Sequence, residues 1–91
     1  MNVRELSEQV AKQLGVSKAQ VQRTIRATID TIRLEVKRGH KVRMLGFGTF
    51  ELKKYEKRAG RNPQTGAEIM IRARKRPRFR AGKEFISMVD R

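Results

Sequence analysis

The stretch that decides the fold is Gly60-Arg61-Asn62-Pro63-Gln64-Thr65-Gly66, which lies between two basic, strand-like runs, Lys53 to Ala59 and Ala67 to Arg80. A proline between two glycines, with Asn before it, is typical of a tight turn at the tip of a hairpin. The flanking runs are too polar to be buried against an apolar core. We therefore predict a protruding hairpin that holds a ligand, and its charge indicates that the ligand is a polyanion.

Positive charge is concentrated around this turn. The chain has 91 residues and a formal net charge of +14, and residues 53–83 contain twelve Lys and Arg but only two Glu. A basic field of this size favours association with nucleic acid or with an anionic membrane, and does not choose between them.

Two helices are predicted before the strands. Asn2 and Glu5 have the spacing of a capping box, and Gly15 ends the first helix. Ser17 caps a second helix, which Gly39 ends. The apolar stripe of the second helix has helical spacing and consists of Val21, Ile25, Ile29, Ile32 and Val36. Two helices joined by a short turn predict an αα-hairpin.

From Lys41 onward the apolar period changes from helical to alternating. Residues 42–44 form a short strand, Gly46-Phe47-Gly48 a turn, and Thr49 to Tyr55 a second strand. The segment from Lys83 to Arg91 fits a short helix with Phe85, Met88 and Val89 facing inward. The predicted fold class is α+β, with a small antiparallel sheet, one long β-hairpin arm and a short C-terminal helix.

The apolar content indicates an oligomer. Only 37% of the residues are hydrophobic, Trp is absent, and no cysteine is available for a disulfide. A domain of this size is near the lower limit for independent stability, so a second chain is expected to complete the core. The residues assigned to the core or dimer interface are Ile25, Ile29, Ile32, Val36, Phe47, Phe50 and Phe79.

The residues that enzymes and metal sites require do not cluster in this sequence. It has one histidine, His40, no cysteine and no group of carboxylates with ligand spacing. The serines lack a base to activate them. We expect no enzyme activity, no metal, no cofactor and no small-molecule substrate. No apolar run reaches the ~18–20 residues needed to span a bilayer.

Three motifs together resemble the bacterial HU/IHF family of DNA-bending nucleoid proteins: Gly46-Phe47-Gly48-Thr49-Phe50, the segment 60–66, and Pro77-Arg78-Phe79-Arg80-Ala81-Gly82-Lys83. The resemblance covers the whole chain. It implies an intertwined dimer in the cytoplasm, at the nucleoid, with a β-sheet saddle and two arms in the minor groove of double-stranded DNA. It also implies a single domain, 1–91, with a helical dimerisation body (1–40), the sheet and DNA-binding arm (41–82) and a C-terminal helix (83–91).

The resemblance assigns roles to individual residues. Pro63 matches the proline that wedges between base pairs, and Arg61 and Asn62 match minor-groove contacts. Arg80 and Lys83 match saddle positions. The full set of predicted DNA-binding residues is Lys53, Arg58, Arg61, Asn62, Pro63, Arg72, Arg74, Lys75, Arg78, Arg80 and Lys83.

The chain departs from the family pattern in its distribution of charge. Basic residues common in the family are missing at Val3, Tyr55, Ala67 and Ile86. Arginines are added at positions that are neutral or apolar in many members, namely Arg72, Arg76 and Arg78. We expect these changes to move phosphate contacts from the lower body toward the arm bases and the saddle.

The leading hypothesis is a homodimer that binds, bends and compacts double-stranded DNA with little sequence preference, as HU does. The alternative within the family is an IHF-type subunit of a heterodimer, which recognises specific sites through DNA shape. Two further classes fit the charge. An RNA-binding protein would need an aromatic stacking platform, and a surface-bound membrane protein would need a basic amphipathic helix; the sequence favours neither.

Overall fold

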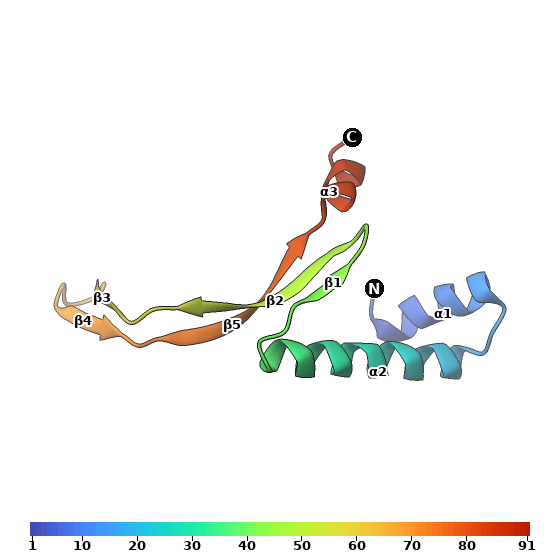
Figure 1. Ribbon diagram of the computed structural model, residues 1–91, viewed down its shortest axis with the longest axis horizontal. Helices are drawn as coiled ribbons and strands as arrows, with labels where there is room; N and C mark the ends of the chain where they lie inside the picture. The colour runs from blue at the N-terminus through green and yellow to red at the C-terminus, as the bar shows by residue number, and fades with distance from the viewer. The chain divides into compact units, whose positions relative to one another are not determined.

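The computed structural model describes residues 1–91 and divides them into two compact units, Met1–Glu35 and Val36–Arg91. Helix α1 (Val3–Leu14) and most of α2 (Lys18–Lys37) form the first unit. The second contains the last residues of α2 and five strands, followed by α3 (Figure 1). Their bounds are β1 Val42–Met44, β2 Gly48–Tyr55, β3 Arg58–Arg61, β4 Glu68–Ile71, β5 Arg74–Ala81 and α3 Lys83–Val89.

The helix boundaries of the first unit are set by the predicted caps. Asn2 Oδ1 accepts a hydrogen bond of 2.9 Å from the backbone N–H of Glu5. Gly15 ends α1 in the left-handed region (φ 70°), where a glycine has no steric penalty, and its N–H donates to Ala11 O. Ser17 Oγ accepts from Gln20 N–H at the start of α2. These caps satisfy backbone groups that the helices themselves leave unpaired.

The apolar stripe of α2 is only partly covered in the single chain. Val21 and Val36 are buried, whereas Ile25 and Ile32 are half-buried and Ile29 is 41% exposed. Of the apolar side chains in the whole chain, only Ala11, Val21 and Val36 are buried. The expected thin core is therefore confirmed, and much apolar surface is left for a partner to cover.

The second unit is built on one antiparallel ladder. The three-stranded sheet has the order β1-β2-β5, and β3 pairs with β4 in a separate two-stranded sheet. β2 and β5 pair from Gly48↔Ala81 to Tyr55↔Arg74. Pro77 lies in β5, an edge strand of this sheet, which agrees with the expectation from its missing N–H donor.

The arm is not one continuous ladder, contrary to the two uninterrupted runs expected from the sequence. Pairing stops after Tyr55↔Arg74 and resumes at Arg58↔Ile71, so residues 56–57 and 72–73 are unpaired. The same number of residues is skipped on both strands, and the register is unchanged across the gap. The gap therefore interrupts the hydrogen-bonded ladder without introducing a β-bulge.

Four phenylalanines form the apolar cluster of the second unit. The ring centroid of Phe79 lies 4.8 Å from that of Phe50 and 5.1 Å from that of Phe47, and Phe47 stacks on Phe85 at 5.4 Å. Phe47 and Phe79 remain 43% and 39% exposed. The inward orientation expected for the end of α3 is wrong for the single chain, because Met88 and Val89 are 68% and 72% exposed. The chain has no helix with the length and apolarity to cross a membrane.

Two strand glycines allow a matched test of this packing. A Cβ at Gly48 would lie 2.6 Å from ring atoms of Phe79 and 2.7 Å from the carbonyl oxygen of Arg80. A Cβ at Gly60 would lie 2.7 Å from Cδ1 of Ile71, the mobile end of a flexible side chain. We expect Gly48→Ala to lower the free energy of unfolding by about 1–3 kcal/mol through overpacking. Gly60→Ala should change it by less than about 1 kcal/mol.

The measurement is urea denaturation followed by circular dichroism at one fixed protein concentration. Equal losses for the two variants would contradict the close packing at Gly48.

Candidate nucleic-acid interface

The β2–β5 ladder separates its arginines from its phenylalanines. Directly paired residues of an antiparallel sheet project on the same side, and successive residues project on opposite sides. One side, which we call the arginine face, contains the pairs Thr49–Arg80, Glu51–Arg78, Lys53–Arg76 and Tyr55–Arg74. The opposite side contains Phe50–Phe79, Leu52–Pro77 and Lys54–Lys75. Register alone therefore collects four arginines from alternate positions of β5.

Side-chain contacts confirm this division. Arg78 Nη2 lies 2.6 Å from Glu51 Oε2, and the Arg74 guanidinium lies over the Tyr55 ring, 4.9 Å from its centroid. β1 extends the arginine face, because Arg43 pairs with Thr49 and Thr49 pairs with Arg80. Five arginines from two strands thus share one side of the three-stranded sheet.

Glu51 is the acidic residue of the arginine face. Its side chain is 9% exposed, and its second oxygen, Oε1, lies 3.3 Å from Arg80 Nη2. The hydrogen bond from Arg78 lowers the pKa of the Glu51 carboxyl below its ordinary value, while burial acts in the opposite direction. The charges of Arg80, Arg78 and Lys41 lower it further. Glu51 is therefore a carboxylate at neutral pH.

A hollow lies at one end of the arginine face, where α3 begins. Its lining includes four cations, Lys41, Arg43, Arg80 and Lys83, and one acid, Glu84. The backbone N–H of Gly82 donates to Phe47 O and ties the start of α3 to the β1–β2 turn. The positive surface therefore extends from the middle of the ladder to the start of α3.

The tip of the arm is a well-defined turn. Asn62 accepts a hydrogen bond of 2.7 Å from Gly66 N–H at its carbonyl, and its Oδ1 accepts one of 2.9 Å from Gln64 N–H. Gly66 has φ +71°, a conformation that favours glycine. These contacts leave the ring of Pro63 exposed at the tip. Arg61 Nη1 donates to Gly66 O and is also exposed.

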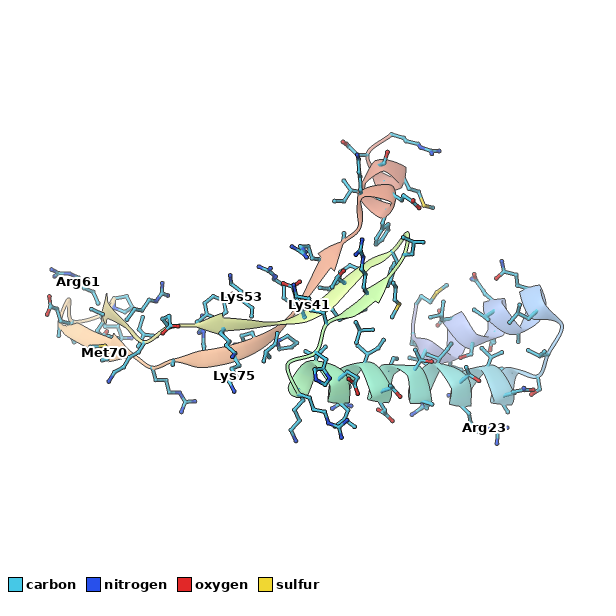
Figure 2. All side chains as sticks on the ribbon, viewed as in Figure 1. Arg23, Lys41, Lys53, Arg61, Met70 and Lys75 are labelled. Atoms are coloured by element: carbon cyan, nitrogen blue, oxygen red, sulfur yellow. The ribbon has the colours of Figure 1, made fainter.

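The predicted DNA-binding residues fall into separate groups. Lys53, Arg74, Arg78 and Arg80 lie on the arginine face, and Lys75 lies on the opposite side of the same ladder. Figure 2 shows Lys53 and Lys75 projecting in opposite directions from the middle of the arm, with Arg61 near its tip. Arg72 lies in the unpaired gap. Arg58 and Arg61 project on opposite sides of the β3–β4 hairpin, because they are three residues apart on one strand.

Two arginines of the arginine face are not among the residues assigned to the interface from the sequence. Arg76 pairs with Lys53, and Arg43 pairs with Thr49. The alternation Arg74, Arg76, Arg78, Arg80 could have identified Arg76. Arg43 could not be added in the same way, because its side depends on the β1–β2 register.

Comparison with known proteins gives one consistent result. The family model described as bacterial DNA-binding protein matches residues 1–90. The chain is 47% identical over 90 residues to the DNA-binding protein HU-beta of Salmonella typhimurium, covering 99% of this chain and all of the relative. It is 46% identical over 83 residues to the DNA-binding protein HRm of Rhizobium meliloti, covering 91% and 92% of the two chains.

Solved structures agree. The chain is similar to HU in a cocrystal of Anabaena HU with DNA, with a TM-score of 0.86, 40% identity and coverage of 98% and 97%. It is also similar to HU from Thermotoga maritima, with a TM-score of 0.69, 28% identity and 98% of both chains covered. The family predicted from the three motifs is thus confirmed. This chain belongs to the bacterial DNA-binding protein family that includes HU.

Proposed function

We propose that this chain is an HU-type architectural protein that binds, bends and compacts double-stranded DNA in the bacterial nucleoid as a homodimer. The observation that carries the proposal is the register of β2 and β5, which collects arginines on one side of the ladder and phenylalanines on the other. The same ladder leads to a tip with an exposed proline. The proposal is also supported by the family to which the chain belongs, which is a family of DNA-binding proteins and not of enzymes.

The arginine face and the arm supply complementary functions. Arginines that alternate along a strand contact phosphates and supply affinity that depends little on sequence. At the tip, the rigid ring of Pro63 would enter between two base pairs of the minor groove, at a cost of roughly a few kcal/mol. Arg61 and Asn62 beside it would contact the groove. Added contacts between the bent duplex and the arginine face would offset this free-energy cost.

Exposed apolar surface supports a homodimer. Ile29 of α2 and Phe47 and Phe79 of the aromatic cluster are each about 40% exposed in the single chain. A second copy presents the same apolar surfaces, so each set can be covered by residues of a second copy. The HU names of the relatives favour this assembly over an IHF-type heterodimer. Purification of the chain alone as a stable, DNA-binding dimer would support the choice.

The function is tested by fluorescence resonance energy transfer between the ends of a doubly labelled ~35-bp duplex of arbitrary sequence. We expect transfer to rise as the chain binds. If a dimer neutralises 6–10 phosphates, affinity should fall about 10³–10⁵-fold between 50 and 200 mM salt. Binding without a rise in transfer would contradict bending, and preference for duplex RNA of equal length would contradict a DNA-specific role.

The wedge is tested by Pro63→Ala, with Gln64→Ala as the matched control in the same turn. We expect Pro63→Ala to keep the dimer and to bind within a few-fold of the unmodified chain, since the arginines remain. It should lose much of the rise in energy transfer, because alanine cannot hold a base step open. Bending equal to that of the control would reduce Pro63 to a turn residue.

The two sides of β5 are compared through adjacent residues, Arg76→Ala on the arginine face and Lys75→Ala on the other side. Each variant removes one positive charge per chain. We expect Arg76→Ala to weaken binding more, and to reduce the slope of log affinity against log salt by about two per dimer. Equal effects in fluorescence anisotropy titrations would show that DNA contacts both sides of the ladder.

A further inference from the structure

The arginine face contains a buried acid that DNA binding by itself does not require. Glu51 is buried and lies directly opposite Arg78 in the ladder. Arg80 follows Arg78 on the same side of β5, with Phe79 between them in the sequence. The carboxylate is thus enclosed between two guanidinium groups that would otherwise face a duplex.

The two arginines are bound to Glu51 unequally. Arg78 donates a hydrogen bond of 2.6 Å to Oε2. Arg80 lies 3.3 Å from Oε1, but Oε1 is buried and accepts no hydrogen bond. The side chains of Arg78 and Arg80 are 42% and 61% exposed, whereas that of Glu51 is 9% exposed. The guanidinium groups are therefore accessible to a ligand, whereas the carboxylate is buried beneath them.

We propose that Glu51 acts as an internal competitor of DNA phosphate, occupying Arg78 and Arg80 in the free protein and yielding them when a duplex reaches the arginine face. This inference rests on the proposed function. Carboxylate and phosphate oxygens accept hydrogen bonds from guanidinium in the same forked geometry, so one can replace the other.

The direction of the effect follows from the relative exposure of the groups. If Glu51 mainly held the arginines in position for DNA, its removal would weaken binding. However, a carboxylate that stays beneath the duplex after its partners turn away repels the nearest phosphates. Because Glu51 is buried, we expect this repulsion to exceed any benefit of positioning. Glu51 therefore lowers the affinity of the arginine face and its dependence on salt.

The test is Glu51→Gln in the intact chain, which keeps the shape of the side chain and removes its charge. Affinity for a ~35-bp duplex is measured by fluorescence anisotropy at salt concentrations from 50 to 300 mM. We expect binding about 3–10-fold tighter at 150 mM salt, and a salt slope steeper by about two per dimer.

The matched control is Glu56→Gln, which removes the same charge from an exposed position in the unpaired gap of the same hairpin. The proposal requires a larger effect at position 51 than at position 56. It also requires the effects of Glu51→Gln and Arg78→Ala on affinity to be non-additive, because the two side chains form one ion pair.

Unchanged or weaker binding by a folded Glu51→Gln dimer would overturn the proposal while leaving DNA binding intact. No binding by the unmodified chain at low salt would overturn the proposed function, and the inference with it. These two failures are distinguished by the same titration series.

A second measurement uses the unmodified chain and does not depend on the folding of a variant. Nuclear magnetic resonance signals of the Glu51 carboxyl carbon and the Arg78 side-chain nitrogens are followed as the duplex is added. We expect both sets to shift at saturation, because the ion pair is exchanged for phosphate contacts. If both stay at their free positions in the saturated complex, the exchange does not occur.

Discussion

The register between β2 and β5 is the constraint on which the rest of the second unit depends. Side chains alternate between the two sides of a strand. The pairing of Glu51 with Arg78 therefore fixes the side on which all remaining residues of both strands project. A shift of one residue between the two strands would place Phe50 of β2 on the same side as the arginines of β5. The strong contrast between the two faces therefore stabilises a single register, and that register creates the charged surface.

Charge and packing are thus coupled in one element. Phe50 directly precedes Glu51 in β2, and Phe79 directly follows Arg78 in β5. The ring centroids of the two phenylalanines lie 4.8 Å apart, on the side opposite the Glu51–Arg78 ion pair. Closely spaced like charges would separate the strands if they were the only side chains there. The aromatic contacts on the other side oppose that repulsion, and Glu51 offsets part of it. The surface can therefore be strongly basic without loss of the ladder.

Most elements could be predicted from the sequence because they depend on local signals. Asn2 and Ser17 mark helix starts because their side-chain oxygens accept hydrogen bonds from backbone N–H groups, and Gly15 ends α1 through its own backbone N–H. The turn around Pro63 is evident from its residue types. The ion pair of Glu51 with Arg78 was not, because it joins residues 27 apart and depends on the register. The gap at 56–57 and 72–73 was also missed, since those residues are compatible with strands.

The arm keeps one register on both sides of its unpaired gap, and this limits how the length of the arm can change. The strands enter it at Tyr55↔Arg74 and leave it at Arg58↔Ile71 without a change of register. A residue inserted into one strand alone would leave unequal numbers of unpaired residues in the gap, so that this strand would bulge or the pairing beyond the gap would shift. Matched insertions, one in each strand, would lengthen the arm and keep the pairing. Relatives with longer or shorter arms should therefore differ by equal numbers of residues on both strands.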